Sequence, residues 1–340
     1  MRALSRFLGC AALLTACTDP PASTPSQPEP REATAPAESP TPAANPWRSR
    51  AQAALDEADV PGAVVVVDLA SGELVQAERA GRAAHPAAEA RSPGSTLKPL
   101  LALIGLHERV IAADEILPCT GKRTIDGESF TCFEEHGPLA LAEALSTSCN
   151  AYSYELATRL GVGRIHDHYV AFGLADDGGV VPEQPTTDSA AALLGTGHGG
   201  VAVSPVALAR AYAALATGVA PTGHSKRWRY TSEELATVRA AMHGVVQSER
   251  GTGSAAAVPG LTILGKTGTT EHGEGDDAQP LALFAGWAPA DAPAGVVVVA
   301  LESPSPGGEV AAPVARRLFA HLLADAERPA PAEPSATPEE

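Results

Sequence analysis

The sequence predicts an α+β fold: an antiparallel five-stranded sheet flanked by helices, with an all-α lobe inserted between its first and last strands. Three observations indicate this. Strand-like apolar runs lie near the two ends of the folded region. Only loops separate the later runs, whereas parallel strands would need long crossover connections. The middle of the chain carries helical apolar spacing. A cleft where the two lobes meet is the natural place for a site.

Five segments have the composition of strands, and they form two groups. In the first group, residues 62–68 are β-branched and follow a Pro-Gly pair, and Ser71-Gly72 turns the chain back into residues 73–77. The second group comprises residues 261–267, 281–287 and 295–301. We expect all five segments to form one sheet. Since the two groups are far apart in the sequence, the two ends of the folded region must then meet in that sheet.

Helices are indicated in the middle and at the end of the same region. Ser204 is a favourable N-cap, and Pro205 suits the first position of a helix over residues 205–217. Residues 231–246 and 309–324 carry the same apolar spacing. These helices are expected to build the inserted lobe and to cover the sheet.

The N-terminus has the pattern of an export signal. Residues 1–16 combine a positively charged start with an apolar run that is too short to span a bilayer. The run ends in Leu-Thr-Ala followed by Cys17, which resembles the lipobox of bacterial lipoproteins. The resemblance implies that Cys17 is acylated and anchors the protein to a membrane, on the periplasmic side of the bacterial envelope. The alternative is a general secretory signal cleaved near the same place; both export the protein.

Two segments lack the large apolar residues that a core requires. Residues 17–46 are rich in Pro, Ala, Ser, Thr and Glu, which predicts a disordered, partly extended tether. Residues 327–340 repeat that composition and are expected to form a disordered tail. The folded domain is therefore placed at residues 47–326.

The five cysteines are Cys10, Cys17, Cys119, Cys132 and Cys149. Export to an oxidising compartment permits disulfides. Cys119 and Cys132 are close enough in sequence to close a short loop, and such a bridge typically stabilises a fold by about 3 kcal/mol. Cys149 would then stay free. The alternative is that all three are reduced, buried thiols.

The charge of the chain excludes one large class of partner. The formal net charge is −16 and the sequence pI is about 5.0. A nucleic-acid phosphate backbone would repel such a surface, so we expect no nucleic-acid binding.

A possible nucleophile occurs at Ser95, in Ser95-Thr96-Leu97-Lys98. This segment follows Pro93-Gly94 and opens an apolar run that indicates a buried helix. Ser95 would lie at the first turn of that helix, and Lys98 on the same face one turn later. A serine hydroxyl needs a base, and a buried lysine can provide it because desolvation disfavours its ammonium form. Alone, Ser-x-x-Lys is a weak signal.

Two further motifs make the signal specific. Ser148-Cys149-Asn150 lies in the helical section, and Lys266-Thr267-Gly268-Thr269 ends the strand predicted at 261–267. A residue larger than Gly268 would crowd a substrate lying along that strand. The order Ser-x-x-Lys, Ser-x-Asn, Lys-Thr-Gly resembles that of the penicillin-recognising serine enzymes. Residues 91–99 and 119–150 resemble the class B transpeptidase branch of the penicillin-binding proteins, and the resemblance extends over 61–323.

The resemblance implies a role for each motif residue. Ser95 would attack the penultimate D-Ala carbonyl, with Lys98 as its base. Ser148 would pass a proton to the departing D-Ala nitrogen near Lys266. The substrate contacts would come from the side chains of Asn150, Thr267 and Thr269, beside Gly268, and from the backbone N–H groups of Ser95 and Thr269.

The same resemblance implies a peptidoglycan D,D-transpeptidase that acts on stem peptides and is inhibited by β-lactams, and whose acyl-enzyme would also allow D,D-carboxypeptidase activity. Two alternatives are a serine β-lactamase of the same fold and a non-catalytic sensor of β-lactams or peptidoglycan. No Glu-x-x-Leu-Asn segment, which one lactamase class uses to activate water, follows Asn150. We expect no cofactor and no metal.

Overall fold

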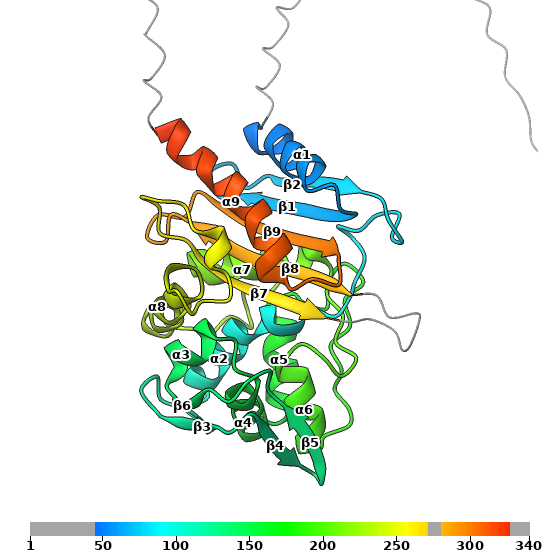
Figure 1. Ribbon diagram of the computed structural model, residues 1–340. Helices are drawn as coiled ribbons and strands as arrows, with labels where there is room; N and C mark the ends of the chain where they lie inside the picture. Colours follow the sequence, from blue (N-terminus) through cyan, green and yellow to red (C-terminus); the bar gives the residue numbers. More distant parts are fainter. Residues whose placement is uncertain (1–44, 271–279, 327–340) are drawn as a thin grey trace, which may run out of the picture. The chain divides into compact units, whose positions relative to one another are not determined.

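The sheet at the centre of the fold joins the two ends of the folded region. A computed structural model describes residues 45–270 and 280–326 of the chain. Its five-stranded sheet has the order β2-β1-β9-β8-β7, and every neighbouring pair is antiparallel. The strands are β1 (Gly62–Asp68), β2 (Leu74–Arg79), β7 (Leu264–Thr270), β8 (Leu281–Ala288) and β9 (Gly295–Glu302). The predicted fold class is confirmed, including the pairing of distant segments (Figure 1).

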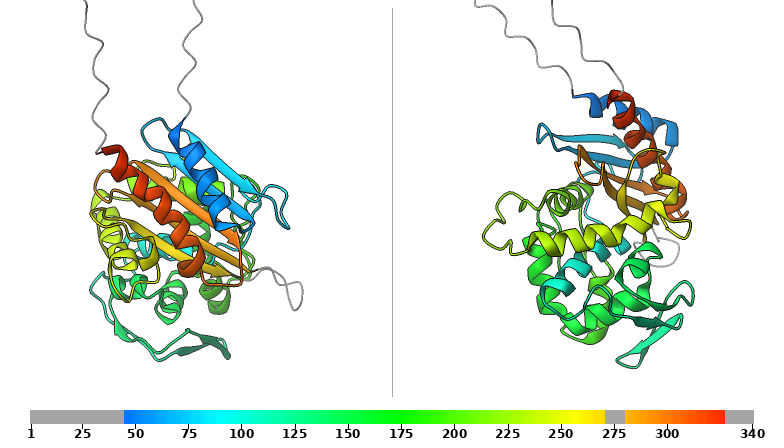
Figure 2. Two further views of the ribbon diagram at one scale, coloured as in Figure 1. Left: turned by 45° about the horizontal axis from the view of Figure 1, so that its top comes forward. Right: turned by 90° about the vertical axis from the view of Figure 1, so that its left-hand side faces the viewer.

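Helices cover both faces of this sheet. On one face lie α1 (Pro46–Ala58) and α9 (Gly307–Ala326), which cross the strands in the left view of Figure 2. On the other face α7 (Pro205–Thr217) packs against β1, β8 and β9. All of β8 and nearly all of β9 are buried as a result. A strand covered on both faces is apolar along most of its length and does not alternate; β8 fits this pattern throughout, and β9 fits it up to Glu302.

The helical lobe surrounds α2 (Lys98–His107), which follows the short 3-10 turn η1 (Gly94–Leu97). Because α2 is apolar almost all round, it is stable only when buried by its neighbours. Those neighbours are α3 (Leu141–Ser146), α4 (Asn150–Leu160), α5 (Val162–Ala171), α6 (Asp188–Gly195) and α8 (Ser232–Gln247). Of these, α8 also packs against β7 and so connects the lobe to the sheet.

Two small sheets lie at the outer end of the lobe. One pairs β3 (Leu117–Cys119) with β6 (Gly137–Leu139), and the other pairs β4 (Lys122–Ile125) with β5 (Glu128–Thr131). Their four strands are three or four residues long and partly exposed, which explains why no strand pattern marks them in the sequence. A two-stranded sheet of this size is marginal by itself, so it depends on other contacts.

Most of the predicted elements are found within a few residues of their expected positions, with three differences. Helix α1 was not predicted; it begins at Pro46 with Asn45 as its N-cap and buries Trp47. Strand β7 begins three residues later than expected, so the Lys-Thr-Gly motif lies inside the strand and not at its end. A further 3-10 turn, η2 (Ser254–Ala256), lies between α8 and β7.

The expected signal segment, Cys17, most of the tether and the expected tail lie outside the described residues. Within the described ranges, none of the helices combines the length and the apolar character that crossing a bilayer requires.

Candidate active site

Ser95 lies in η1, just before α2, and two hydrogen bonds from other parts of the chain hold this turn. Gly94 has φ +51° and donates its N–H to the carbonyl of Gly197 at 3.1 Å. A left-handed conformation of this kind favours glycine. The buried Tyr212 hydroxyl of α7 donates to the carbonyl of Thr96 at 2.7 Å. The side chain of Ser95 itself is partly exposed. The nucleophile predicted from the sequence is thus presented on a rigid turn.

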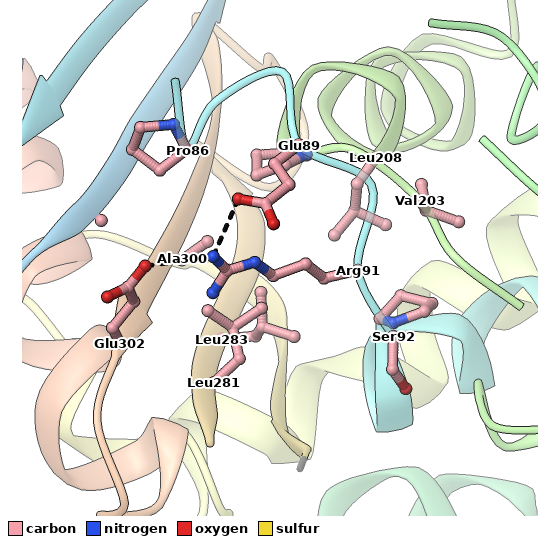
Figure 3. Close-up of a pocket in the computed structure, with 13 residues that line it drawn as sticks. Pro86, Glu89, Arg91, Ser92, Val203, Leu208, Leu281, Leu283, Ala300 and Glu302 are labelled. Carbon is pink, nitrogen blue, oxygen red and sulfur yellow. Dashed lines mark hydrogen bonds and ion pairs between the residues drawn. The ribbon is translucent and has the colours of Figure 1, made fainter. Parts of the chain in front are cut away.

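A buried arginine holds the segment that leads into this turn. The guanidinium of Arg91 contacts Glu89 at 2.8 Å and Glu302 of β9 at 3.1 Å (Figure 3). Its backbone exchanges two hydrogen bonds with Val203, at 3.2 and 2.8 Å. Arg91 therefore connects strand β9, the segment that precedes α7 and the residues that lead to Ser95. The sequence analysis did not single it out, because its function depends on partners more than 100 residues away.

Lys98 is buried and directed at the Ser-x-Asn motif. Its Nζ donates to the carbonyl of Ser148 at 2.6 Å, to Oδ1 of Asn150 at 2.6 Å and to Oγ of Ser148 at 3.3 Å. Burial lowers the pKa of Lys98 from its usual 10.5 to about 8, a shift that nearby Cys149 and Cys132 oppose. The desolvated lysine that a serine nucleophile needs is therefore present, one turn from Ser95.

Ser148 connects the two lysines of the site. Its Oγ lies 2.8 Å from Nζ of Lys266 and 3.3 Å from Nζ of Lys98. Ser148 has φ +55°, a conformation that costs free energy in a non-glycine residue and that is found disproportionately at functional sites. A hydroxyl oxygen can accept two hydrogen bonds and still donate its own proton. Ser148 is thus placed to exchange a proton with either lysine or with a third group.

Lys266 comes from β7, the strand at the edge of the sheet beside η1. Its side chain is fully buried and also donates to the carbonyl of Thr267 at 3.1 Å. Burial, and then the positive charge of Lys98, hold the pKa of Lys266 well below its ordinary value of 10.5. Two buried ammonium groups beside one hydroxyl repel each other, which favours proton transfer from one of them.

Gly268 has a structural role in addition to the room for substrate that the sequence predicts. A Cβ atom there would lie 3.0 Å from Cγ2 of Thr96 and 3.2 Å from the carbonyl oxygen of Pro93. The missing side chain therefore lets β7 pack directly against the turn that carries Ser95. Next to it, the hydroxyl of Thr267 donates to Oγ1 of Thr252 at 2.7 Å. Thr252 is thus a neighbour of the motif that the sequence analysis did not assign to the site.

Thr269 lies on the exposed side of β7 and accepts a hydrogen bond from the N–H of Gly307 at 3.1 Å. The structure therefore brings Lys98, Ser148, Asn150 and Lys266 into one hydrogen-bonded network. It places Ser95, Thr267, Gly268 and Thr269 along its border, on η1 and β7. Four acidic residues that follow the Lys-Thr-Gly motif in the sequence, Glu271, Glu274, Asp276 and Asp277, lie outside the described residues.

The cysteines are arranged differently from the prediction. The expected bridge between Cys119 and Cys132 is absent: the three cysteines of the described residues are free thiols. Cys119, Cys132, Cys149 and His136 gather at one point, with all four ligand atoms within 4.8 Å of one another. The spacing Cys-x12-Cys-x3-His-x12-Cys was visible in the sequence, but His136 was not counted with the cysteines.

The geometry of this cluster fits a tetrahedral zinc ion. Zinc–ligand bond lengths place two sulfurs about 3.8 Å apart, and a sulfur and a nitrogen about 3.5 Å apart. The Sγ atoms of Cys132 and Cys149 are 4.0 Å apart. Nδ1 of His136 is 3.4 Å from the Cys119 sulfur and 3.5 Å from the Cys132 sulfur. A disulfide needs sulfurs about 2.05 Å apart, so this set of four has the spacing of metal ligands.

The surroundings of His136 support the same assignment. Its Nε2 has no hydrogen-bond partner in good geometry and is buried, yet it lies 3.3 Å from a carboxylate oxygen of Glu134. Metal-bound histidines usually turn their other ring nitrogen toward a carboxylate. The hydrogen bond between the Cys132 and Cys149 sulfurs, together with backbone N–H donors, also lowers the pKa of Cys132. These residues could hold zinc in a Cys3His site, contrary to the expectation of no metal.

The fold and the order of the three motifs point to one class of proteins, and the comparison with known proteins identifies the family. Residues 62–320 match the model for the penicillin binding protein transpeptidase domain. Because the match covers most of the chain, this protein belongs to that family.

Similarity to curated proteins supports the same family. The chain is similar to penicillin-binding protein 3 of Bacillus subtilis, with 31% identity over 53% of this chain and 31% of the relative. It is also similar to the probable peptidoglycan D,D-transpeptidase FtsI of Caulobacter vibrioides, with 29% identity over 76% of this chain and 51% of the relative. The chain thus spans about a third of the first relative and about half of the second.

Solved structures give the same fold. The transpeptidase domain of Burkholderia pseudomallei penicillin-binding protein 3 has 25% identity and a TM-score of 0.71, covering 85% of this chain and 95% of that one. Pseudomonas aeruginosa PBP2 has 24% identity and a TM-score of 0.72, covering 85% and 80%. The family expected from the sequence is confirmed.

Proposed function

We propose that this protein is an exported peptidoglycan D,D-transpeptidase with Ser95 as its nucleophile. The observation that carries the proposal is the position of the Ser148 hydroxyl between Lys98 and Lys266, next to the turn that presents Ser95. Curated relatives bear the name peptidoglycan D,D-transpeptidase. The network supplies a base, a proton relay and a second cation, which are the groups that acyl transfer needs.

Acylation begins with the proton of Ser95. A lysine with a pKa of about 8 is about one-tenth neutral at pH 7, whereas an ordinary lysine is almost wholly charged. Neutral Lys98 takes the Ser95 proton as Oγ bonds to the carbonyl carbon of the penultimate D-Ala. The backbone N–H groups of Ser95 and Thr269 would stabilise the oxyanion.

The leaving group then needs a proton. The Ser148 hydroxyl passes its proton to the D-Ala nitrogen as the peptide C–N bond breaks, and it is reprotonated by Lys98 or Lys266. Free D-Ala departs, and the acyl-enzyme remains at Ser95. An acceptor amine of another stem peptide reverses these steps and forms the cross-link; water in its place would give D,D-carboxypeptidase activity.

Substrate contacts come from the residues around the network. Asn150 directs Oδ1 to Lys98 and one amide proton to the carbonyl of Thr131 at 3.3 Å, so its second amide proton can reach the stem peptide. The terminal carboxylate of the substrate would lie beside the hydroxyls of Thr267 and Thr269. A β-lactam would occupy the same place and acylate Ser95.

Among the residues that the structure describes, no carboxylate is an obvious base for hydrolysis of the acyl-enzyme, which supports a transferase over a β-lactamase. Glu155 is the first carboxylate after the Ser-x-Asn motif. It contacts Arg159 at 2.7 Å and also pairs with Arg123, so it is committed to ion pairs in the lobe. The complete network, in turn, supports an enzyme over a non-catalytic sensor.

The protein is proposed to act in the periplasm, with Cys17 lipidated, attached to a membrane and without nucleic-acid partners. Replacing Cys17 by Ala should release the mature protein from the membrane fraction or leave it unprocessed. A correctly processed native protein recovered entirely in the soluble fraction would refute the anchor.

The central test is covalent labelling. Fluorescent penicillin should acylate the protein, and Ser95→Ala should abolish labelling while circular dichroism shows an intact fold. Incubation with pentapeptide muropeptides should then give a mass increase at Ser95 and, with an acceptor, cross-linked product. Equal labelling of Ser95→Ala contradicts the assignment. Turnover of penicillin at ordinary enzyme rates, about 10 s⁻¹, would favour the β-lactamase.

A further inference from the structure

The cysteine–histidine cluster and the active site share a segment of backbone. Cys149 is the residue between Ser148 and Asn150. The N–H of Asn150 donates to the sulfur of Cys132 at 3.2 Å, and the N–H of Tyr152 donates to the sulfur of Cys149 at 3.4 Å. The first N–H groups of α4 are therefore satisfied by sulfur atoms of the cluster. Movement of these sulfurs must displace the two residues that hold Lys98.

The cluster also connects four segments of the lobe that are separate in the sequence. Cys119 ends β3, Cys132 follows β5, and His136 precedes β6. The fourth member, Cys149, is the N-cap of α4. A bound ion would thus hold both small sheets against the start of α4, whereas a single disulfide would connect only two of the four residues.

The sulfur atoms differ in their access to solvent. Cys132 is partly exposed, whereas Cys119 and Cys149 are buried. The sulfur of Cys149 lies 4.0 Å from that of Cys132, and they would have to approach to about 2 Å to form a bond. An oxidant would therefore reach Cys132 first and find Cys149 as the neighbouring thiol.

We propose that the cluster is a redox-sensitive zinc site that switches the neighbouring active site off when it is oxidised. The oxidant is hydrogen peroxide. The Cys132 thiolate attacks one peroxide oxygen, giving a sulfenic acid and, with one proton, water. The Cys149 thiolate then attacks that sulfur; with a second proton, a second water leaves and a Cys132–Cys149 disulfide forms. Two thiolates are oxidised, one peroxide is reduced to two waters, and the zinc ion is released.

Oxidation inactivates the site because it displaces the residues that hold Lys98. Drawing the two sulfurs together removes the acceptor of the Asn150 N–H and shifts Cys149 relative to α4. Ser148 and Asn150 supply all three hydrogen bonds recorded for the Lys98 ammonium, at 2.6, 2.6 and 3.3 Å. A shift of about 1 Å in such a network can cost on the order of 100-fold in rate. We expect acylation of Ser95 to slow at least tenfold.

The test uses the full chain with Cys10→Ser and Cys17→Ser, so that Cys119, Cys132 and Cys149 are its only thiols. The untreated protein should contain one zinc per chain by mass spectrometry of the metal. Hydrogen peroxide should release zinc to a chromogenic chelator, give a Cys132–Cys149 peptide on mapping, and slow fluorescent-penicillin acylation. Dithiothreitol with added zinc should restore all three properties.

The matched control is Cys132→Ser in the same background, compared with its own untreated rate. It cannot form the disulfide, so peroxide should change its acylation less than twofold. An equal loss in this variant would overturn the proposal, as would zinc-free native protein or a disulfide that leaves acylation unchanged. The reversible cycle in the parent decides the question if the variant does not fold.

This proposal rests on the proposed function only for its rate measurement. Zinc release and disulfide mapping need no substrate, and hydrogen exchange over residues 141–160 reports coupling to the Ser-x-Asn motif directly. If the untreated parent is not acylated by penicillin, the transpeptidase assignment fails. In that case, loss of amide protection at 148–152 on oxidation would still support the switch, and unchanged protection would overturn it.

Discussion

The sheet and the outer part of the helical lobe are held together in different ways, and the active site draws residues from both. Strands β8 and β9 are buried on both faces by helices and contribute apolar residues throughout. The small sheets β3–β6 and β4–β5 are short and partly exposed, and each contributes only a few buried apolar side chains beside the cysteine–histidine cluster. Lys266 comes from the first region, and Ser148 and Asn150 are tied to the second.

This difference indicates which part of the hydrogen-bonded network is most easily displaced. Lys266 lies on a strand whose pairing with β8 is continuous over seven residues. Ser148 lies in a strained connection between two helices, and its neighbours are held by sulfur atoms. Changes in the lobe should therefore alter the network without unfolding the sheet. Changes in the sheet that leave the lobe folded and alter only the network should be rare.

The largest expected effect comes from removing the base that links the two regions. Lys98→Ala should slow penicillin acylation by about 10²–10⁴-fold, because general-base help is lost. Stopped-flow labelling measures the rate, and Lys122→Ala, an exposed lysine of β4, is the matched control. Undiminished acylation of Lys98→Ala would remove the lysine from the mechanism.

Removal of the metal should affect the stability of the two regions to clearly different extents. A bound ion at 1,000 times its dissociation constant stabilises a fold by about 4 kcal/mol. A strong chelator should therefore lower the melting temperature and increase hydrogen exchange over residues 117–150, while residues 281–302 keep their protection. Equal loss of protection in both regions, or no change in either, would contradict this comparison.

Arg91 tests the attachment of the nucleophile to the sheet. Arg91→Ala leaves the largely buried carboxylate of Glu302 without its ion-pair partner, which costs about 3 kcal/mol in comparable sites. Urea unfolding should show this loss, and the acylation rate should fall because the approach to Ser95 is released. Arg48→Ala, which breaks an exposed pair with Glu73, is the control and should cost less than about 1 kcal/mol.

The smallest effect concerns pH. Burial lowers the pKa of Lys98 to about 8, and the reactive form is the neutral amine. Raising the pH from 7 to 9 should raise the neutral fraction from about one-tenth to about nine-tenths, so acylation should rise by nearly tenfold and then level off. Rates of penicillin acylation at constant ionic strength provide the profile. A flat profile between pH 6.5 and 9 would show that Lys98 does not titrate in this range.

Much of the fold could be predicted because its signals are local. The β-branched run of β1 and the Ser204-Pro205 start of α7 need no distant partner to be recognised. By contrast, β3 to β6 are too short for periodicity, and α1 carries few apolar residues besides Trp47 and Leu55. The shift of β7 by three residues arises because pairing with β8, and not composition, sets where the strand begins.

The family and the order of the three motifs could be recognised from the sequence, and so could the roles proposed for Ser95, Lys98 and Lys266, because those residues occur in a specific pattern along the chain. Only the tertiary structure decided that Ser148 lies between the two lysines and that Gly268 allows β7 to meet the nucleophile's turn. It also decided that the cysteines gather with His136 and do not form the expected bridge. These contacts join residues of which some lie more than 100 positions apart. Their distances are set by tertiary packing, which the spacing of motifs along the sequence does not encode.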